Sequence, residues 1–324
     1  MVGTGYWGKN LLRNFHALGA LAAFCEVREE ARNEYARLYP EASVYADIGE
    51  LLSSDSIDAA VIATPAETHG ALVLQALAAG KHVFVEKPLC LNLEEAEQLR
   101  RAAKARGLVL MVGHLLLYHG AFQALKRLVQ EGNLGRLRYV YSNRLSLGKI
   151  RREENALWSF APHDVSMILQ LTGALPKSVV ATGGHYLTPG IADTTLSHLA
   201  FPGGVQAHIF VSWLHPFKDQ RLVAVGSDGM AVFNDTLPGK DKLALYRHGL
   251  GWDGDIPLIN RAQAEPVDYD DREPLRSECQ AFLDAVAQGS RPPSDAEEGI
   301  RVLRVLNACQ RSIDIGARVS LDEV

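Results

Sequence analysis

Short apolar runs alternate with helix-like segments over the first third of the chain. Unbroken apolar or β-branched runs are typical of parallel strands that are covered on both faces. Such runs lie at residues 21–25, 59–63, 82–85 and 108–112. Between them, apolar positions recur at helical spacing in residues 9–18, 68–79 and 93–105. Repeated strand–helix units of this kind predict an α/β domain with a doubly wound parallel sheet.

One of these helices carries its own start and stop signals. Asn92 can cap the helix at 93–105, and Glu95 stands where a capping box places an acid. Gly107 follows the last periodic residues, as the end of a helix requires. The sequence therefore predicts this helix with defined ends.

After about residue 115 the pattern changes to alternating apolar and polar positions. Residues 205–214 alternate with a period of two, as expected of a strand that is covered on one face. Similar runs lie at 137–147, 178–187, 194–201 and 221–233. Within the last run, Ser227-Asp228-Gly229 predicts a hairpin turn, and residues 273–289 and 295–313 are helical again. We expect a second, α+β domain with an open, mainly antiparallel sheet.

The length of the chain, 324 residues, exceeds what one hydrophobic core usually supports. We expect a first domain at residues 1–115 and a second at 116–324, whose C-terminal helices could pack back on the first. Lys and Arg number 33 against 38 Asp and Glu, a net charge of −5 that disfavours a nucleic-acid partner. No uncharged apolar run approaches the roughly 20 residues of a membrane span.

The four cysteines are far apart in the sequence and form no CxxC motif. They predict neither a local zinc site nor a redox motif, although a pair could still meet in the fold. We expect no metal and a reduced chain. No signal peptide opens the sequence, so a cytoplasmic protein is expected.

A glycine-rich loop opens the chain as Gly3-Thr-Gly5-Tyr-Trp-Gly8 and leads into the first predicted helix. In a G-x-G-x-x-G loop the glycines permit a tight turn, close approach of the backbone to a pyrophosphate, and close helix–sheet packing. The helix N-terminus then offers N–H donors to the phosphates. The loop predicts a Rossmann dinucleotide site, with these candidate contacts: Gly3, Gly5, Tyr6, Trp7 and Gly8.

Glu26 is the candidate ligand for the adenosine ribose. It ends the second predicted strand, 18 residues past Gly8, near the position where such sites carry an acid. A carboxylate here would repel a 2′-phosphate, so NAD is favoured over NADP. Arg28 could instead accept that phosphate, and Glu26 could simply be solvated.

The first strand of this fold is nearly missing. Only Met1 and Val2 precede Gly3, whereas the loop normally follows a strand of about five residues. The shortness suggests a trimmed chain or a start codon placed too late. Alternatively, the sheet tolerates a very short first strand, which would leave backbone N–H and C=O groups of the neighbouring strands unpaired.

A further motif follows the apolar strand that ends near residue 85. Val85-Glu86-Lys87-Pro88-Leu89 resembles the Glu-Lys-Pro motif of the glucose–fructose oxidoreductase/inositol dehydrogenase (Gfo/Idh/MocA) family. The glycine loop, Ala63-Thr-Pro65 followed by His69, Gly80-Lys-His82, and His163 ten residues before Gly173 agree in type and order. The resemblance covers essentially the whole chain and implies an NAD(P)-dependent oxidoreductase acting on CH–OH groups.

Lys87 is the first candidate for catalysis. It lies at the carboxyl end of a strand, where open α/β sheets bind ligands, and it can donate to a substrate oxygen. A cis Lys87–Pro88 bond would direct the side chain inward; the alternative is an exposed surface lysine. The resemblance implies a catalytic role for Lys87 and these cofactor contacts: Thr64, Pro65, His69, Glu86 and Lys87.

His163 is the second catalytic candidate, since an imidazole can accept the hydroxyl proton near neutral pH. The resemblance implies an aspartate four residues before it, where this chain has Ser159. Asp164 is adjacent but need not orient the ring. Pro162 suggests a helix start at this point, and the alternative is a helix-capping or core histidine. His114 and His119 are second choices.

Within the family, the segment around residues 144–164 looks similar to dehydrogenases that oxidise C3 of UDP-N-acetylglucosamine or its uronic acid. Arginines and lysines can hold a diphosphate or a carboxylate, and an indole can pack on a sugar or uridine face. A solvated basic loop and a core tryptophan are the alternatives. The candidate substrate contacts are Tyr118, Arg144, Lys149, Arg152, Asn155, Trp158, His163 and Asp164.

The function predicted is an NAD-dependent dehydrogenase of a nucleotide-linked N-acetyl sugar in polysaccharide or lipopolysaccharide sugar biosynthesis. Two alternatives stay open: a dehydrogenase of a free polyol or aldose such as an inositol, and a sugar-sensing regulator that binds NAD without turnover. The predicted sheet alternates apolar residues such as Phe210 with polar ones on both faces. Because one face must be covered, we expect a homodimer or homotetramer.

Overall fold

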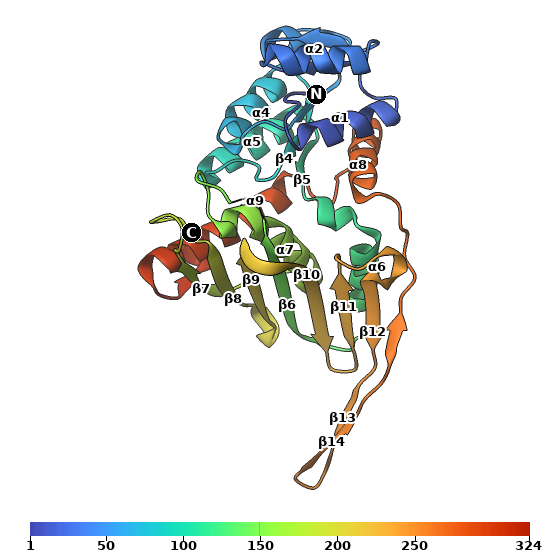
Figure 1. Cartoon of the computed structure of the whole chain (residues 1–324), viewed down its shortest axis with the longest axis vertical. Coiled ribbons are helices and arrows are strands. Elements are labelled where there is room, and N and C mark those ends of the chain that lie inside the picture. The colour runs from blue at the N-terminus through green and yellow to red at the C-terminus, as the bar shows by residue number, and fades with distance from the viewer. Residues whose placement is uncertain (149) are drawn as a thin grey trace. The chain divides into compact units, whose positions relative to one another are not determined.

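The computed structural model describes residues 1–148 and 150–324 (Figure 1). Tertiary contacts divide the chain into two compact units. The first unit contains Met1–Leu115 and Glu273–Leu303, and the second contains Leu116–Arg272 and Arg304–Val324. Each unit therefore consists of two separate stretches of the chain.

The first unit contains the predicted doubly wound parallel sheet. Its strands are β1 (Ala23–Cys25), β2 (Ser43–Tyr45), β3 (Ala59–Ile62), β4 (His82–Glu86) and β5 (Leu110–Gly113). β1 pairs with β2, and β3, β4 and β5 pair in sequence order, all in parallel. Val2 forms parallel bridges to both Cys25 and Ile62 and so joins the two groups. The Rossmann fold is confirmed, with a first strand reduced to a stub.

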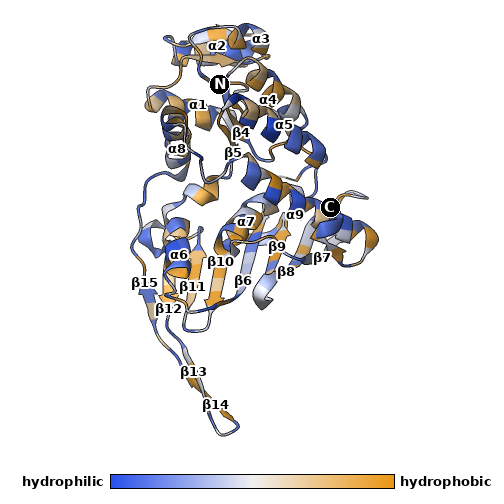
Figure 2. Cartoon of the chain, turned by 180° about the vertical axis from the view of Figure 1, so that it is seen from behind, coloured by the Kyte–Doolittle hydropathy of each residue, from blue (hydrophilic) through white to orange (hydrophobic). Residues whose placement is uncertain are grey.

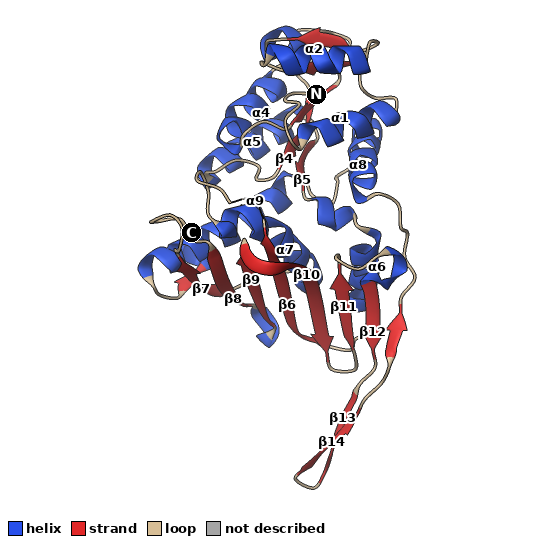
Figure 3. Cartoon of the chain, viewed as in Figure 1, coloured by secondary structure: helices blue, strands red, loops and turns tan. Residues whose placement is uncertain are grey.

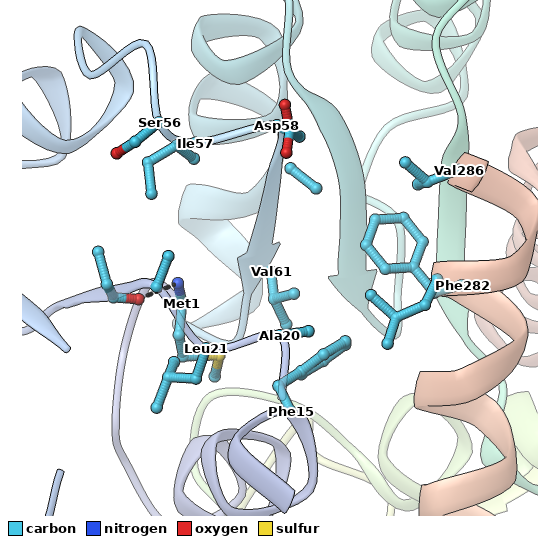
Figure 4. A pocket seen from close by; sticks show the side chains of 14 residues that line it. Met1, Phe15, Ala20, Leu21, Ser56, Ile57, Asp58, Val61, Phe282 and Val286 are labelled. Atoms are coloured by element: carbon cyan, nitrogen blue, oxygen red, sulfur yellow. Dashed lines mark hydrogen bonds between the residues drawn. The ribbon is translucent and has the colours of Figure 1, made fainter. Parts of the chain in front are cut away.

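The stub still bonds to both of its neighbours. Val2 N–H donates to Val61 O at 2.7 Å, and Gly3 N–H donates to Cys25 O at 2.9 Å. The amino group of Met1 is buried and donates to Ala23 O; burial lowers its pKa to about 5. Beside Met1 lies a cavity of about 230 Å³ with a largely apolar lining (Figure 4). The central strand therefore begins beside an apolar hollow.

Helices cover the parallel sheet of the first unit. They are α1 (Gly8–Ala17), α2 (Glu29–Leu38), α3 (Ile48–Leu52), α4 (His69–Ala78), α5 (Leu93–Arg106) and α8 (Pro274–Gln288), with the first half of α9 (Ala296–Ile315). The predicted ends of α5 are confirmed: Asn92 accepts hydrogen bonds from Glu94 N and Glu95 N, and Gly107 adopts a left-handed conformation with φ of 64°.

Three aromatic rings from distant parts of the chain form the centre of the first unit. The rings of Phe15 and Phe84 meet edge to face at 6.3 Å, and each also meets Phe282 on α8, at 6.3 and 5.8 Å. All three side chains are buried, and such pairs add stability beyond the burial of their area. The returning helix α8 is therefore part of the hydrophobic core of this unit.

The second unit is built on one open sheet. Its strand order is β15-β12-β11-β10-β6-β9-β8-β7-β16, and of the described pairings only β6 with β9 is parallel. The strands are β6 (Leu137–Leu147), β7 (Ser178–Gly184), β8 (Thr194–Ala200), β9 (Gln206–Ser212), β10 (Leu214–Gly226), β11 (Met230–Asn234), β12 (Leu243–Tyr246), β15 (Ala264–Pro266) and β16 (Val319–Ser320). The predicted turn at residues 227–229 connects β10 to β11, and the mainly antiparallel sheet is confirmed.

Helices lie on one face of this sheet (Figure 3). α7 (Ala156–Thr172) packs on β6, β8 and β9, and α6 (Gly120–Gln130) packs on β11 and β12. On the other face, the rings of Tyr139, Tyr141 and His208 gather with centroids 5.3 to 5.8 Å apart. Leu196 on the same face is 50% exposed. The second face is thus apolar and aromatic, and no helix in the described part of the chain covers it.

A hairpin extends from the sheet beyond β12 (Figure 2). It consists of β13 (Gly249–Asp253) and β14 (Ile256–Asn260), paired in antiparallel register. Its large apolar side chains are exposed: Leu250, Trp252, Ile256, Leu258 and Ile259. Short 3₁₀ turns lie at Ala66–Thr68, Leu115–Tyr118, Pro202–Gly204, Gly239–Lys242 and Leu321–Glu323. Within the described residues, every helix is too short or too polar to span a bilayer.

Candidate active site

The glycine loop of the first unit has the geometry that a pyrophosphate needs. Gly3 has φ of +82°, a conformation that side chains disfavour. A Cβ on Gly8 would lie 2.2 Å from Gly3 O, so the start of α1 packs directly on the loop. A Cβ on Gly5 would meet nothing within 4 Å, which leaves its backbone open to a ligand. The residues present therefore fit the diphosphate of a dinucleotide.

The N-terminus of α1 is also prepared for an anion. Trp7 occupies the N-cap without a side-chain capping bond, and the first turn holds no acid. By contrast, α5 is capped by Asn92 and begins with two glutamates. The uncapped N–H groups and the helix dipole favour a phosphate at α1. Tyr6, beside this end, is 82% exposed.

Glu26 lies at the carboxyl end of β1 with both oxygens bonded. Oε2 accepts from Thr4 N at 2.9 Å and Thr4 Oγ1 at 2.7 Å. Arg28 donates to Oε1 from its backbone N and Nε, and to Oε2 from Nη2. Burial raises the pKa of Glu26, but the hydrogen bonds from Arg28 and Thr4 outweigh it and lower the pKa to about 2. A fixed carboxylate thus stands where a ribose would lie.

The loops after β3 and β4 are connected through His69. Its Nδ1 lies 2.7 Å from Pro88 O, and its Nε2 lies 3.0 Å from Thr64 O. Burial lowers the pKa of His69, although both carbonyls oppose that shift. The Thr64 hydroxyl lies 2.7 Å from the hydroxyl of Thr68, which donates to Pro65 O. His69 is 1% exposed, so its contacts with the backbone of both loops are buried.

Glu86 and Lys87 stand at the carboxyl end of β4. Trp7 Nε1 donates to Glu86 Oε1 at 2.5 Å, which connects the glycine loop to this strand. Burial raises the pKa of Glu86 to about 7, against the opposing charge of Lys87 and the bond from Trp7. Lys87 is half-buried, and the Lys87–Pro88 bond is cis, as predicted. The lysine and the carboxyl group thus form a neighbouring proton donor and acceptor at the strand end.

Two buried ionisable groups lie near this strand end in the same unit. Glu278 on α8 and His114 after β5 are each 1% exposed, and neither has a hydrogen-bond partner among the described residues. Burial, together with the neighbouring Glu86, raises the pKa of Glu278 far above its usual range. Burial and the charge of Lys87 lower the pKa of His114 to about 3. Burial thus disfavours the charged form of both groups.

The motif analysis did not predict Glu278. A signal for it exists in the sequence, because Glu278 falls on the apolar face of its helix. It lies three residues after Leu275 and four before Phe282, both of which are buried. An acid at such a position is either partnered or protonated.

His163 lies on α7 of the second unit and is half-buried. The helix start expected at Pro162 is wrong: α7 begins at Ala156, and Pro162 lies inside it. The cap is Asn155, whose side chain accepts from Trp158 N at 3.2 Å. Asparagine is a strong N-cap, so the helix has formed two turns before the proline interrupts one bond of its ladder. Ser159, buried, lies one turn before His163.

Arg144 on β6 and Asp164 on α7 form a buried ion pair. Arg144 Nε donates to Asp164 Oδ2 at 2.7 Å, and Nη2 donates to Oδ1 at 3.1 Å. Ser142, two residues before Arg144 on the same face of β6, also donates to Asp164 Oδ1. Asp164 is 0% and Arg144 8% exposed. These two predicted substrate contacts thus bind each other inside the second unit.

The other predicted substrate residues differ in their exposure. Arg152 is exposed, whereas Arg151 pairs with Glu154 at 3.0 Å. Trp158 is half-buried, and its Nε1 donates to Gln310 at 3.1 Å. The same oxygen accepts from Asn155 Nδ2 at 2.8 Å. Tyr118 is buried, and Lys149 lies outside the described residues.

Metal ligation finds no support in the side chains that the structure describes. Within this part of the chain, no group of three or more His, Cys, Asp or Glu could hold an ion. The four cysteines are free thiols, and all are buried. Burial raises the pKa of Cys90 and Cys309 to about 12. These thiols are therefore structural rather than reactive.

A Rossmann sheet, a glycine loop open to a diphosphate and a lysine at a strand end define an NAD(P)-dependent oxidoreductase. Comparisons with known proteins agree. A family model described as an oxidoreductase family with an NAD-binding Rossmann fold matches residues 1–114. A model of the GFO/IDH/MocA C-terminal domain matches residues 122–232. The chain belongs to the Gfo/Idh/MocA family, and the resemblance seen in the motifs is confirmed.

Individual relatives cover nearly the whole chain. UDP-N-acetylglucosamine 3-dehydrogenase of Acidithiobacillus ferrooxidans is 31% identical over 308 residues, which cover 94% of this chain and 93% of the relative. A solved structure of that enzyme superposes with a TM-score of 0.85 at 28% identity, covering 97% and 96% of the two chains. The NAD-dependent scyllo-inositol 2-dehydrogenase of Bacillus subtilis is 28% identical, covering 84% of this chain and 80% of the relative.

Proposed function

We propose that the protein is an NAD-dependent dehydrogenase that oxidises C3 of a UDP-linked N-acetyl sugar, UDP-N-acetylglucosamine or its uronic acid. The observation that carries the proposal is the similarity, over 94% of the chain, to a relative named as UDP-N-acetylglucosamine 3-dehydrogenase. Arg152, exposed just before α7, is the candidate for the charge of the diphosphate or carboxylate. Trp158, with Asn155 beside it, is the candidate for the sugar or uridine face.

The cofactor would be held by the first unit. The backbone of Gly3, Gly5 and Gly8 and the start of α1 would take the diphosphate. Glu26 would accept the ribose hydroxyls, and its carboxylate supports NAD over NADP. The loops at Thr64 and Lys87 would face the nicotinamide end. When bound, NAD supplies the hydride acceptor, which no side chain can replace.

Oxidation of a secondary alcohol also requires removal of the hydroxyl proton. His163 would accept that proton, because a neutral imidazole has a basic nitrogen near pH 7. Lys87 would donate a hydrogen bond to the substrate oxygen and stabilise negative charge that develops on it. Glu86, whose pKa is about 7 because of burial, can take or release a proton beside Lys87.

A second candidate function is oxidation of a free polyol. Two observations support it: the similarity to an inositol dehydrogenase, and the burial of Arg144 against Asp164. Arg144 and Arg151 are thus both paired with carboxylates, so this segment offers fewer available cations for a diphosphate. A non-catalytic NAD-binding sensor is the third candidate, which any turnover would exclude.

The deciding experiment is a panel of UDP-sugars and free sugars, incubated with NAD⁺ and analysed by NADH absorbance and product mass. We expect a UDP-N-acetyl sugar to lose two hydrogens, and inositols or glucose to react at least ten times more slowly. Oxidation of scyllo-inositol alone would reject the nucleotide-sugar substrate but leave the dehydrogenase. Tight NADH binding without turnover of any sugar would favour the sensor.

We propose further that a second copy covers the outer face of the sheet, giving a homodimer or homotetramer. Support comes from the aromatic group Tyr139, Tyr141 and His208 and from exposed Leu196, which lie on a face without helices. The exposed hairpin β13–β14 adds apolar area at the edge of the same unit. An isolated two-stranded hairpin is marginal in water, so contact with a second copy would stabilise it.

A further inference from the structure

The ion pair between Arg144 and Asp164 lies directly beside the proposed catalytic histidine in the sequence. Asp164 follows His163 on α7, and adjacent Cα atoms are about 3.8 Å apart. Among the described residues, its carboxylate accepts side-chain hydrogen bonds from β6: two from Arg144 and one from Ser142. A helix residue and a strand are thus bonded through three hydrogen bonds next to His163.

The backbone of α7 is weakest at the same place. Pro162 has no N–H, so one bond of the helical ladder is missing within one turn of His163. The Ser166 hydroxyl donates to His163 O at 2.9 Å, which binds the helix on the C-terminal side of the proline. The side-chain contacts of Asp164 supply the connection to the sheet. They fix both the rotation of this turn about the helix axis and its height over β6.

Stability alone does not explain such a pair. Two buried charges lose their hydration, and replacing a buried ion pair with apolar residues is often neutral or stabilising. A bidentate pair does, however, define one geometry for the two elements that it joins. We infer that Arg144, Asp164 and Ser142 are positioning residues that hold His163 in its catalytic orientation, an inference that rests on the proposed role of His163 as the base. Arg144 then binds no substrate.

The pair also keeps the surroundings of His163 electrically balanced. Side chains from two further elements contact α7: Lys126 on α6 donates to Gln170, and the uncharged Gln310 on α9 accepts from Trp158. The charge of Asp314 reaches α7 only through Gln310, which donates to it. Both contacts lie toward the ends of α7. The residues that β8 and β9 direct to α7 are uncharged: Thr195, Ser197, Leu199, Ala207, Ile209 and Val211. Among the described residues, Arg144 is therefore the cation that neutralises Asp164, the residue that follows His163 on the helix.

The first test follows the imidazole by NMR with ¹³C-histidine in the full-length protein, the signal being assigned by its loss in His163→Gln. In Arg144→Gln, Asp164 keeps an uncompensated negative charge, so the pKa of His163 should rise by about half a unit or more. In Asp164→Asn, Arg144 keeps the positive charge, so the pKa should fall by a similar amount. A role confined to stability would lower the melting temperature and leave both pKa values unchanged, which would overturn the inference.

The matched control is Asp219→Asn. Asp219 is also a buried carboxylate paired with an arginine, Arg221, but it bonds Asn143, which points to the opposite face of β6. The control should leave the pKa of His163 within about 0.2 units of the wild-type value. If Arg144→Gln does not fold, Arg144→Lys can replace it, because lysine keeps the positive charge but cannot form the bidentate pair. In that variant the pKa of His163 should stay near the wild-type value.

The second test is kinetic, with UDP-N-acetylglucosamine and scyllo-inositol as probes and NAD⁺ as the oxidant. For a probe that reacts, Asp164→Asn and Arg144→Lys should lower kcat about ten-fold or more with KM changed less than about three-fold. A raised KM with unchanged kcat would make Arg144 a substrate anchor and overturn the inference. If neither probe reacts, the proposed function fails, while the NMR shifts still decide whether the pair controls His163.

Discussion

His69 and Pro88 are joined by a short contact, 2.7 Å between the imidazole Nδ1 and the proline carbonyl oxygen. The other ring nitrogen lies 3.0 Å from Thr64 O. Both partners are acceptors, and a neutral ring donates to only one of them. Since burial lowers the pKa of His69, the ring is neutral at pH 7 and connects the loops after β3 and β4 through one strong bond at a time.

The first prediction concerns this connection. His69→Gln keeps one amide donor but cannot reach both carbonyls, so we expect the free energy of unfolding to fall by about 1–3 kcal/mol. The affinity for NADH should also decrease, because the loops that face it lose their connection. Urea unfolding and fluorescence titration measure the two effects. The control is His16→Gln on a surface position, which should change stability by less than about 0.5 kcal/mol. Equal stability of both variants would contradict the connection.

The second prediction concerns pH. Burial raises the pKa of Glu86 from 4.5 to about 7, and that of Glu278 well above 4.5, so the folded state holds protons that the unfolded state releases. Each of these carboxyl groups therefore makes the stability fall as pH rises above about 5, whereas the Met1 amino group, whose pKa burial lowers to about 5, acts in the opposite direction. Glu278→Gln should reduce that fall by about 1 kcal/mol or more. Urea unfolding at several pH values measures it, with exposed Glu34→Gln as the control. A Glu278→Gln profile parallel to the wild-type one would show that the carboxyl group titrates normally.

The third prediction separates binding from chemistry. Lys87→Ala and His163→Ala should each bind NADH nearly as the wild type does but lower kcat about 100- to 10,000-fold. The reason is that neither residue belongs to the site proposed for the diphosphate and adenosine. Single-turnover kinetics and cofactor titration test both halves of the statement. If His163→Ala keeps a near-normal kcat while Lys87→Ala is inactive, the lysine alone handles the proton.

The fourth prediction rests on Glu26. Because the pKa of Glu26 is about 2, it is a carboxylate throughout the working pH range and would repel a 2′-phosphate. We expect NADH to bind at least ten-fold more tightly than NADPH, and Glu26→Gln to remove most of that difference. Calorimetric titration with both dinucleotides gives the ratio. A wild-type preference for NADPH would mean that Arg28 leaves Glu26 to bind the phosphate.

The fifth prediction concerns the substrate charge. Arg152→Ala should raise KM for a UDP-sugar about ten-fold or more and leave kcat nearly unchanged, because the lost contact is remote from the reacting carbon. Initial rates with the reactive UDP-sugar measure both constants. Arg151→Ala is the matched control, since its side chain already pairs with Glu154. A rise in KM of equal size for a free sugar would show that Arg152 does not bind a phosphate.

The proposed assembly into a homo-oligomer can be tested by sedimentation. At micromolar concentration we expect a dimer or tetramer, and Leu196→Glu should weaken it because a charge would be buried at the outer face of the sheet. Leu38→Glu, on an exposed helix of the first unit, is the control and should leave the mass unchanged. A wild-type monomer at this concentration would refute the assembly.

Much of the fold followed from contiguous patterns. β6 occupies residues 137–147 as predicted, and four of the five strands of the parallel sheet fall within one or two residues of their apolar runs. The fifth, β2, was not predicted because it is a short strand with exposed residues. α2 was not predicted because it has no buried residue and therefore no apolar stripe. The start of α7 was misplaced because proline usually marks a first turn, whereas the stronger cap, Asn155, lies seven residues earlier. Local sequence patterns thus predict an element correctly where one signal, such as an apolar run or a single helix cap, is much stronger than the others.

The candidate site was also predictable only in part. The glycine loop and Lys87 could be found because each belongs to a motif of consecutive residues. The pairing of Arg144 with Asp164 spans 20 positions, and the charge of Glu86 on β4 raises the pKa of Glu278 on α8. Which face of a strand meets which turn of a helix depends on sheet register and packing, so a sequence pattern cannot specify these contacts.

The order of protein synthesis matters for the first unit because its core is assembled from two stretches of the chain. Phe282, which meets Phe15 and Phe84, is translated only after every described strand of the second unit except β16. A nascent chain that has emerged only as far as β5 lacks α8 and leaves the apolar faces of Phe15 and Phe84 exposed. The core of the first unit can therefore be completed only after most of the second unit has been synthesised, although the first unit begins at the N-terminus. We expect ribosome-bound intermediates of this length to need the protection of a chaperone.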